Sequence, residues 1–278
     1  MSKGHIVFLL VFIFTLLGLY FFGEIKPKET RGLNQAQPQL TESNDFDFSI
    51  YVDTWIENLD SERSEIIQEL VSSINKDKLS DADLEHLNPL VSELDNLNSG
   101  VSGYFKEMVA EINGDKASWL ATGDRYANII GIVENPQLRD AFKDRALKAF
   151  EMAKIIDSSD NEIEVRIANV YLESGDDGVM QGVQRLLKVI ENEPDNISAN
   201  MLLGKFGIMS GQFDKASLRL ENVVSSQPQN AEALFLLAEA YRGLGRKDDA
   251  VNTLLKCKEF VDDAELESEI DAYIERLK

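Results

Sequence analysis

The 278-residue sequence has few of the residues that usually carry catalysis, cross-linking or metal binding. Its single cysteine, Cys257, excludes an internal disulfide, and we expect it to be a buried packing residue rather than a reactive thiol. There are only two histidines, His5 and His86, and His86 has no second ligand nearby. The sequence contains no Gly-rich phosphate loop and no G-x-G-x-x-G motif. We therefore predict no enzyme activity, no cofactor and no metal.

Three short motifs are weak signals. The stretch Ser99-Gly100-Val101-Ser102-Gly103 looks like a nucleophile turn, but it has no preceding strand and no base. The acidic stretch 157–162 lacks the glycine of a calcium loop. Asn196 begins a glycosylation sequon in an expected turn. None of the three defines a site.

Basic residues are scarce, with 28 Lys and Arg against 49 Asp and Glu, and the net charge is −21. Residues 1–31 carry four basic and two acidic residues, so the remainder is near −23 (−21 minus +2). A surface this acidic repels nucleic acid and keeps a long helical surface soluble. We predict no nucleic-acid binding.

The only long hydrophobic run is 6–22, interrupted by Thr15 and Gly18. As a helix it would cover roughly 26 Å, just short of a bilayer core. No small-residue cleavage site follows it, so we predict an uncleaved transmembrane signal anchor over 1–23 and a flexible linker over 24–45. This makes the chain a single-pass membrane protein. A basic head before one apolar run favours a periplasmic soluble domain, whereas the basic residues at 26–31 would favour the cytoplasm.

With six prolines and a second half rich in Glu, Asp, Leu and Ala, the chain is predicted to be all-α. Apolar stripes at helical spacing over 66–74, 84–97 and 101–112 predict three helices over 46–113. We interpret 46–115 as a helical extension that caps the following array. A dimerisation coil is the alternative.

Residues 116–264 repeat with a period of about 34. Leu203-Gly204, Gly211 and Ala216 recur 34 residues later as Leu237-Ala238, Gly245 and Ala250. In an earlier copy Trp119 precedes Gly123 by four residues, and Tyr126 follows that glycine by three, as Tyr241 follows Ala238. In this pattern the small residues allow close helix approach and the aromatic fills the adjacent gap. The pattern resembles that of the tetratricopeptide repeat family.

The resemblance implies a solenoid of about four helix–turn–helix repeats, 116–160, 161–196, 197–230 and 231–264, followed by a capping helix over 265–278. The sequence departs from the family pattern in three places. Gly207 stands where Tyr is expected, and Ser158 stands where Pro is usual, as at Pro194 and Pro228. About eleven residues near 130–140 are inserted between the helices of the first repeat.

In this family the first helix of each repeat lines a concave groove, so the resemblance implies a set of inward positions, which we call the inner row. The inner row begins with four apolar residues, one in each repeat, and continues with mixed polar and apolar ones. The predicted protein-binding residues are Leu120, Val165, Asn169, Leu172, Met201, Lys205, Ile208, Phe235, Glu239 and Arg242. Only Lys205 and Asn169 fit a carboxylate clamp, and they lie in different repeats. The row suits a helix or an extended peptide with bulky side chains. The alternative is that these residues only pack between neighbouring helices.

We therefore expect a membrane-anchored scaffold that binds a protein or peptide client. One span followed by an acidic tetratricopeptide domain is similar to bacterial cytochrome c maturation factors and to ancillary factors of the secretion channel. The alternative is a homo-oligomeric membrane spacer without a client, which would self-associate through the 66–74 stripe.

Overall fold

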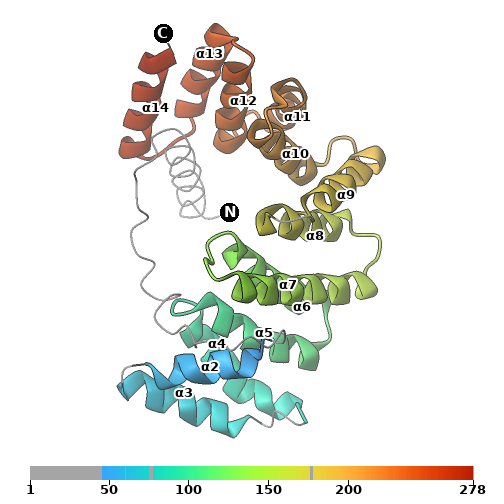
Figure 1. Ribbon diagram of the computed structural model, residues 1–278, viewed down its shortest axis with the longest axis vertical. Helices are drawn as coiled ribbons and strands as arrows, with labels where there is room; N and C mark the ends of the chain where they lie inside the picture. The colour runs from blue at the N-terminus through green and yellow to red at the C-terminus, as the bar shows by residue number, and fades with distance from the viewer. Residues whose placement is uncertain (1–45, 60, 75–77, 176–177, 278) are drawn as a thin grey trace. The chain divides into compact units, whose positions relative to one another are not determined.

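The computed structural model describes residues 46–59, 61–74, 78–175 and 178–277, and every regular element in these ranges is helical (Figure 1). This confirms the prediction of an all-α fold. The predicted anchor over 1–23 and the linker over 24–45 lie outside the described residues. Among the helices that are described, none is both long enough and apolar enough to cross a bilayer.

Successive helices pair as antiparallel hairpins (Figure 1). The bounds are α2 Phe48–Glu57, α3 Ser61–Ser73, η1 Asp81–Asp83, α4 Leu84–Leu94, α5 Ser99–Asn113, α6 Lys116–Ile130, α7 Pro136–Ile156, α8 Asn161–Ser174, α9 Val179–Asn192, α10 Ile197–Met209, α11 Phe213–Ser226, α12 Ala231–Gly243, α13 Lys247–Lys258 and α14 Ala264–Leu277.

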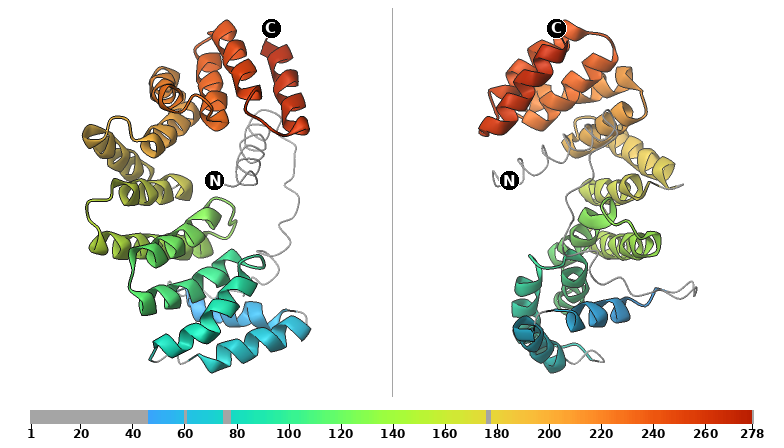
Figure 2. Two further views of the ribbon diagram at one scale, coloured as in Figure 1. Left: turned by 180° about the vertical axis from the view of Figure 1, so that it is seen from behind. Right: turned by 60° about the vertical axis from the view of Figure 1, so that its left-hand side comes forward.

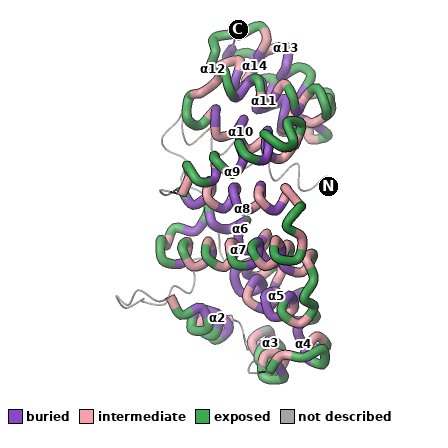
Figure 3. The backbone as a smooth tube through the Cα atoms, turned by 90° about the vertical axis from the view of Figure 1, so that its right-hand side faces the viewer, coloured by how far each residue is buried: buried purple, intermediate pink, exposed green. Residues whose placement is uncertain are grey.

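The chain forms two compact units whose boundary lies inside α9. We call the described residues 46–185 the N-terminal unit and 186–277 the C-terminal unit, and describe each by itself. In each unit the buried residues recur along the helix faces that meet their neighbours (Figure 3).

The first helix of each repeat begins at a capping side chain. Asp115, Asp160, Asn196 and Asn230 each accept a hydrogen bond from a backbone N–H in the first turn of the following helix. The Asn of the glycosylation sequon is therefore the N-cap of α10. The turns inside the last two repeats contain Gly211 and Gly245, whose positive φ values of 74° and 73° favour glycine.

The extension differs from the prediction, because α2 was not expected. The structure has four α-helices over 46–113 instead of three. Asp47 caps α2, and five of the ten residues of this helix are buried. Its buried residues stand at helical spacing, a stripe that the sequence interpretation overlooked: Phe48, Tyr51, Val52, Trp55 and Ile56. Phe48 packs against Tyr126 and Phe142 of the first repeat.

The second half of the insertion in the first repeat is helical, which the sequence interpretation did not predict. Only residues 131–135 separate α6 from α7, and α7 has 21 residues. Asn135 caps α7, and Pro136 occupies its first turn, where a proline is tolerated. The extra turns place Leu138 and Phe142 in the core of the N-terminal unit.

Small residues allow the two helices of a repeat to approach, as predicted. A β-carbon at Gly123 would lie 2.6 Å from Cδ1 of Phe150, and one at Gly204 would lie 2.7 Å from Cγ of Leu220. Phe150 and Leu220 are fully buried. The unexpected Gly207 has the same role, since a β-carbon there would lie 3.0 Å from that of Ala216.

The C-terminal unit ends on α14, which packs beside α13 (Figure 2). Four apolar residues of α14 enter one core cluster with residues of α12 and α13: Leu266, Ile270, Ile274 and Leu277. Cys257 lies in the same cluster, and its thiol donates a hydrogen bond to the carbonyl of Ala231 at 3.2 Å. Burial raises the pKa of this thiol to about 12, so the predicted packing role is confirmed.

Candidate functional site

In the N-terminal unit the inner row lies on α6 and α8. Leu120, Asn169 and Leu172 are partly exposed, whereas Val165 is only 4% exposed. Asp124 of α6 forms an ion pair with Arg166 of α8, so the two helices are joined along this row. Burial raises the pKa of the Asp124 carboxyl, and the Arg166 guanidinium opposes that shift. A partner that contacts this face would meet Asp124 and Arg166 already paired with each other.

In the C-terminal unit the inner row begins on α10. This helix reads ISANMLLGKFGIM, with apolar residues on every face and Lys205 as its one charged residue. Such a helix is usually buried all round. Here Met201, Lys205 and Ile208 are only partly buried, and Met209, one turn after Lys205, is 73% exposed. Helix α10 therefore presents more apolar surface to solvent than its composition predicts.

The next helix, α12, does not present its inner row in the same way. Phe235 and Glu239 are each 1% exposed. Tyr273 of α14 covers both, with its ring 6.2 Å from that of Phe235 and its hydroxyl donating to Glu239. Arg242 pairs with the other carboxylate oxygen of Glu239 at 2.9 Å.

Phe235 and Glu239 are therefore buried rather than exposed along the inner row. The reason is that α14 packs as a further first helix, 34 residues on, so that Tyr273 takes the position equivalent to Glu239. Arg242 remains partly exposed, at the edge of this contact.

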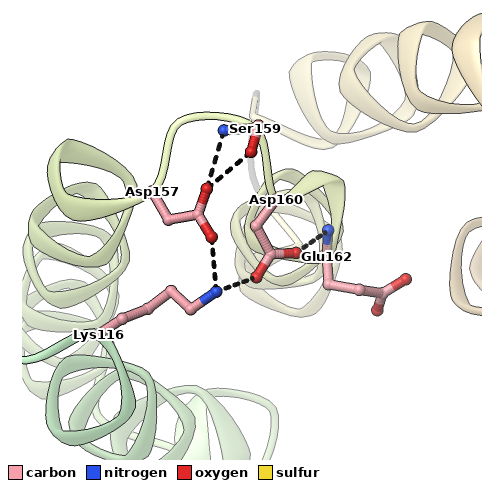
Figure 4. Close-up of polar contacts among 5 residues, drawn as sticks. All are labelled: Lys116, Asp157, Ser159, Asp160 and Glu162. Atoms are coloured by element: carbon pink, nitrogen blue, oxygen red, sulfur yellow. Dashed lines mark hydrogen bonds and ion pairs between the residues drawn. The ribbon is translucent and has the colours of Figure 1, made fainter.

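The acidic stretch 157–162 is organised around a lysine (Figure 4). The ammonium group of Lys116, the first residue of α6, lies 2.7 Å from Oδ2 of Asp157 and 3.0 Å from Oδ2 of Asp160. Asp157 also accepts hydrogen bonds from the backbone N–H and the hydroxyl of Ser159. The bonds from Lys116 and then from Ser159 lower the pKa of Asp157 to about 2.

Neither a metal site nor a nucleophile site is assembled from the motifs in the sequence. Over the described ranges no cluster of His, Cys, Asp and Glu side chains could hold a metal ion. Ser99–Gly103 forms the start of α5, where Ser102 is buried. There Gly100 and Gly103 make room for the rings of Phe142 and Tyr126. The residues of this motif pack helices together.

Three functional-site neighbours were not predicted: Arg166, Tyr273 and Lys116. Tyr273 could have been found, because the 34-residue offset from Glu239 leads directly to it. Lys116 contacts side chains 41 and 44 residues away, and no periodicity in the sequence indicates that pairing.

Comparison with known proteins gives one family match. Residues 208–266 match the tetratricopeptide repeat family. The matched range contains α11, α12 and α13 of the C-terminal unit. No curated protein matches the chain.

Solved structures are similar at low identity. A crystal structure of MamA is 17% identical, with 70% of this chain and 99% of that chain covered and a TM-score of 0.46. A second MamA crystal structure gives 17% identity, coverage of 67% and 93%, and a TM-score of 0.45. YrrB, described as a TPR protein with an unusual peptide-binding site, is 14% identical, with coverage of 74% and 97% and a TM-score of 0.43.

Proposed function

We propose that this protein is an interaction scaffold that binds a helix or an extended peptide of a client protein on the inner row. The match of residues 208–266 to tetratricopeptide repeats supports a protein–protein interaction role, because stacked helical repeats bind partners along their first helices. The inner row of α10 is the part of the predicted site that this proposal relies on most.

One observation carries the proposal. Helix α10 has apolar residues on every face, but one of its faces remains partly exposed to solvent. Met201 and Ile208 rest on the core cluster formed by α11 and α12, so they are held in place while part of each remains exposed. Methionine side chains adapt to differently shaped apolar partners. Together with Met209, they suit a client with bulky apolar side chains at helical or alternating spacing.

Within the N-terminal unit, the inner-row residues exposed enough to contact a client are Leu120, Asn169 and Leu172. Phe235 and Glu239 are left out of the proposed surface, because Tyr273 covers them. Val165 is too buried to contribute more than packing.

The proposal includes the anchor. Residues 6–22 would span a membrane once, with the helical units on the periplasmic side, so that the scaffold serves assembly of a membrane or periplasmic complex. Cytochrome c maturation is one assembly process of this kind. The support here is the apolar run itself and the short basic head before it.

The test is site-specific photo-crosslinking of the full chain in intact membranes. The reactive residue is placed at Met209, which is 73% exposed on the same stripe as Lys205. The matched control is Leu218, which is 63% exposed on α11 and outside the inner row. We expect one dominant client adduct from Met209 and none from Leu218.

A variant pair completes this test. Met209→Glu should abolish client capture, whereas Leu218→Glu should leave it unchanged, with the same helical circular dichroism in both. Equal capture by the two variants would contradict the proposal.

The spacer alternative has one observation in its favour, since Ile66 of α3 is 54% exposed beside the half-buried Leu70. A self-adduct from Ile66, with no client adduct from Met209, would support that alternative.

A further inference from the structure

The turn between the first and second repeats differs in chemistry from the other two turns of its kind. The exits at 193–196 and 227–230 each have proline in second place, Pro194 and Pro228. The equivalent exit, 157–160, has Ser158 there. Proline restricts φ and so stiffens a turn through its own ring. The first exit has no such restraint.

The backbone nevertheless adopts the same shape. Asp157, before Ser158, has φ −141° and ψ 90°. Gln227, before Pro228, has φ −130° and ψ 74°. Both pairs of angles lie outside the helical region, which a following proline disfavours. Residue 157 adopts this conformation although no proline follows it.

Side chains supply the restraint. Asp157 bonds to Ser159 across the turn, and Lys116 bridges Asp157 at the end of α7 and Asp160 at the start of α8 (Figure 4). The Lys116 side chain is 35% exposed and that of Asp157 is 36% exposed, so salt can screen the bridge. In the two turns that contain proline, Asn196 and Asn230 also donate side-chain hydrogen bonds to Glu193 and Gln227. In the third turn a lysine bridge between two carboxylates replaces the proline.

Further ion pairs cross the same junction. Lys154 of α7 contacts Glu164 of α8 at 2.6 Å, and Arg166 of α8 pairs with Asp124 of α6. Buried apolar residues of α8, such as Ile163 and Ile167, also pack on the core of the N-terminal unit. Screening the charges would loosen the angle between α7 and α8 without unfolding either helix.

We infer that the 157–160 turn is a charge-held hinge, and that ionic strength sets how freely α8 moves against α6 and α7. Because α6 and α8 carry the inner row of this unit, the hinge would tune the spacing of that row. This inference goes beyond client binding and does not depend on it.

The test measures distances by double electron–electron resonance on the full chain in detergent. Spin labels on Glu151→Cys and Gln184→Cys, both at exposed positions, report across the 157–160 turn. Labels on Asn222→Cys and Asn252→Cys, also exposed, report across the Pro228 turn as the control. The native Cys257 is buried and stays unlabelled in the folded protein.

Raising salt from about 0.05 M to about 0.5 M should widen the distance distribution of the first pair and leave the control pair unchanged. Lys116→Met should widen the first distribution already at low salt. Adding Ser158→Pro to Lys116→Met should narrow it again, because proline replaces the lost restraint.

Two results would overturn the inference. One is an unchanged 151–184 distribution in Lys116→Met at low salt. The other is equal widening of both pairs, which would indicate general loosening rather than a hinge.

Discussion

The α7–α8 junction and the α11–α12 junction join equivalent helices by different means. In the first, ion pairs of Lys154 with Glu164 and of Lys116 with Asp157 and Asp160 add to the buried apolar residues of α8. In the second, the helices share an apolar cluster formed by Ala216, Leu220, Leu236, Leu237 and Ala240. Across this cluster Tyr241 donates a hydrogen bond to Glu221 at 2.8 Å.

This difference shows that the repeat pattern specifies where helices meet but not what holds them. Close packing of apolar groups is insensitive to salt and costly to disrupt. Partly exposed ion pairs contribute little each and are screened by salt. The two junctions should therefore respond differently to mutation, salt and pH.

The largest effect is expected in the apolar junction. Leu220→Ala removes a fully buried side chain that packs directly on Gly204. We expect the free energy of unfolding to fall by about 2–5 kcal/mol, through lost burial and a cavity. Denaturant unfolding of the full chain should give the same loss at low and high salt.

The control for this change is Leu218→Ala on the same helix, where the side chain is 63% exposed. Its cost should stay within about 0.5 kcal/mol. Similar costs for the two variants would mean that the α11–α12 cluster does not hold this junction.

A smaller effect is expected in the ionic junction from Glu164→Gln. Glu164 accepts from Lys154 and Arg185, each at 2.6 Å. Burial raises the pKa of Glu164, but the two cations outweigh it and leave the pKa below its ordinary value of 4.5. Its stabilising contribution is therefore present above pH 4.5 and is lost as pH falls through the lowered pKa.

We expect Glu164→Gln to cost about 1 kcal/mol or less at neutral pH and low salt. The cost should shrink at high salt and at acidic pH, as measured by denaturant titration. The exposed Glu151→Gln serves as the control. A cost that does not depend on salt would indicate packing rather than charge at this position.

The smallest effect is a shift in one titration. In Lys116→Met, the pKa of Asp157 should rise from about 2 towards its ordinary 3.8, because the largest cause of its lowering is removed. The remaining bonds from Ser159 should keep it below 3.8. Carboxyl NMR over pH 2–5 measures this directly.

Because the folded pKa of Asp157 is lowered, its stabilisation is present above pH 3.8 and is lost as pH falls towards 2. Asp47 is the control, since Ser49 rather than Lys116 lowers its pKa. A shift at Asp47 as large as that at Asp157 would point to a general change in the N-terminal unit.

Helix packing within one hairpin could be predicted from the sequence. The 34-residue offsets located the last two repeats, and the small residue at Gly204 predicted close approach of a large partner. The buried state of Cys257 was also predicted, because a lone cysteine usually packs as a small apolar residue. These features depend on residues within one hairpin, where sequence spacing and spatial contact coincide.

Features that depend on contacts between hairpins were missed. The length of α7 was not predicted. The residues that extend this helix pack on α2 and α5 as well as on its hairpin partner α6. The burial of Phe235 was not predicted for a similar reason. Helix α14 was expected to cap the end of the array, and its contact with the inner row was not foreseen. The α10 part of the candidate site stays a prediction.

The single cysteine can report how often the C-terminal end of the array opens. Cys257 is buried beneath α14 with its pKa near 12, so a thiol reagent can reach it only when that helix separates from α12 and α13. The rate at which a thiol reagent consumes this group therefore counts opening events of the C-terminal end, one molecule at a time. Cys257 is thus a native probe of how often α14 separates from α12 and α13.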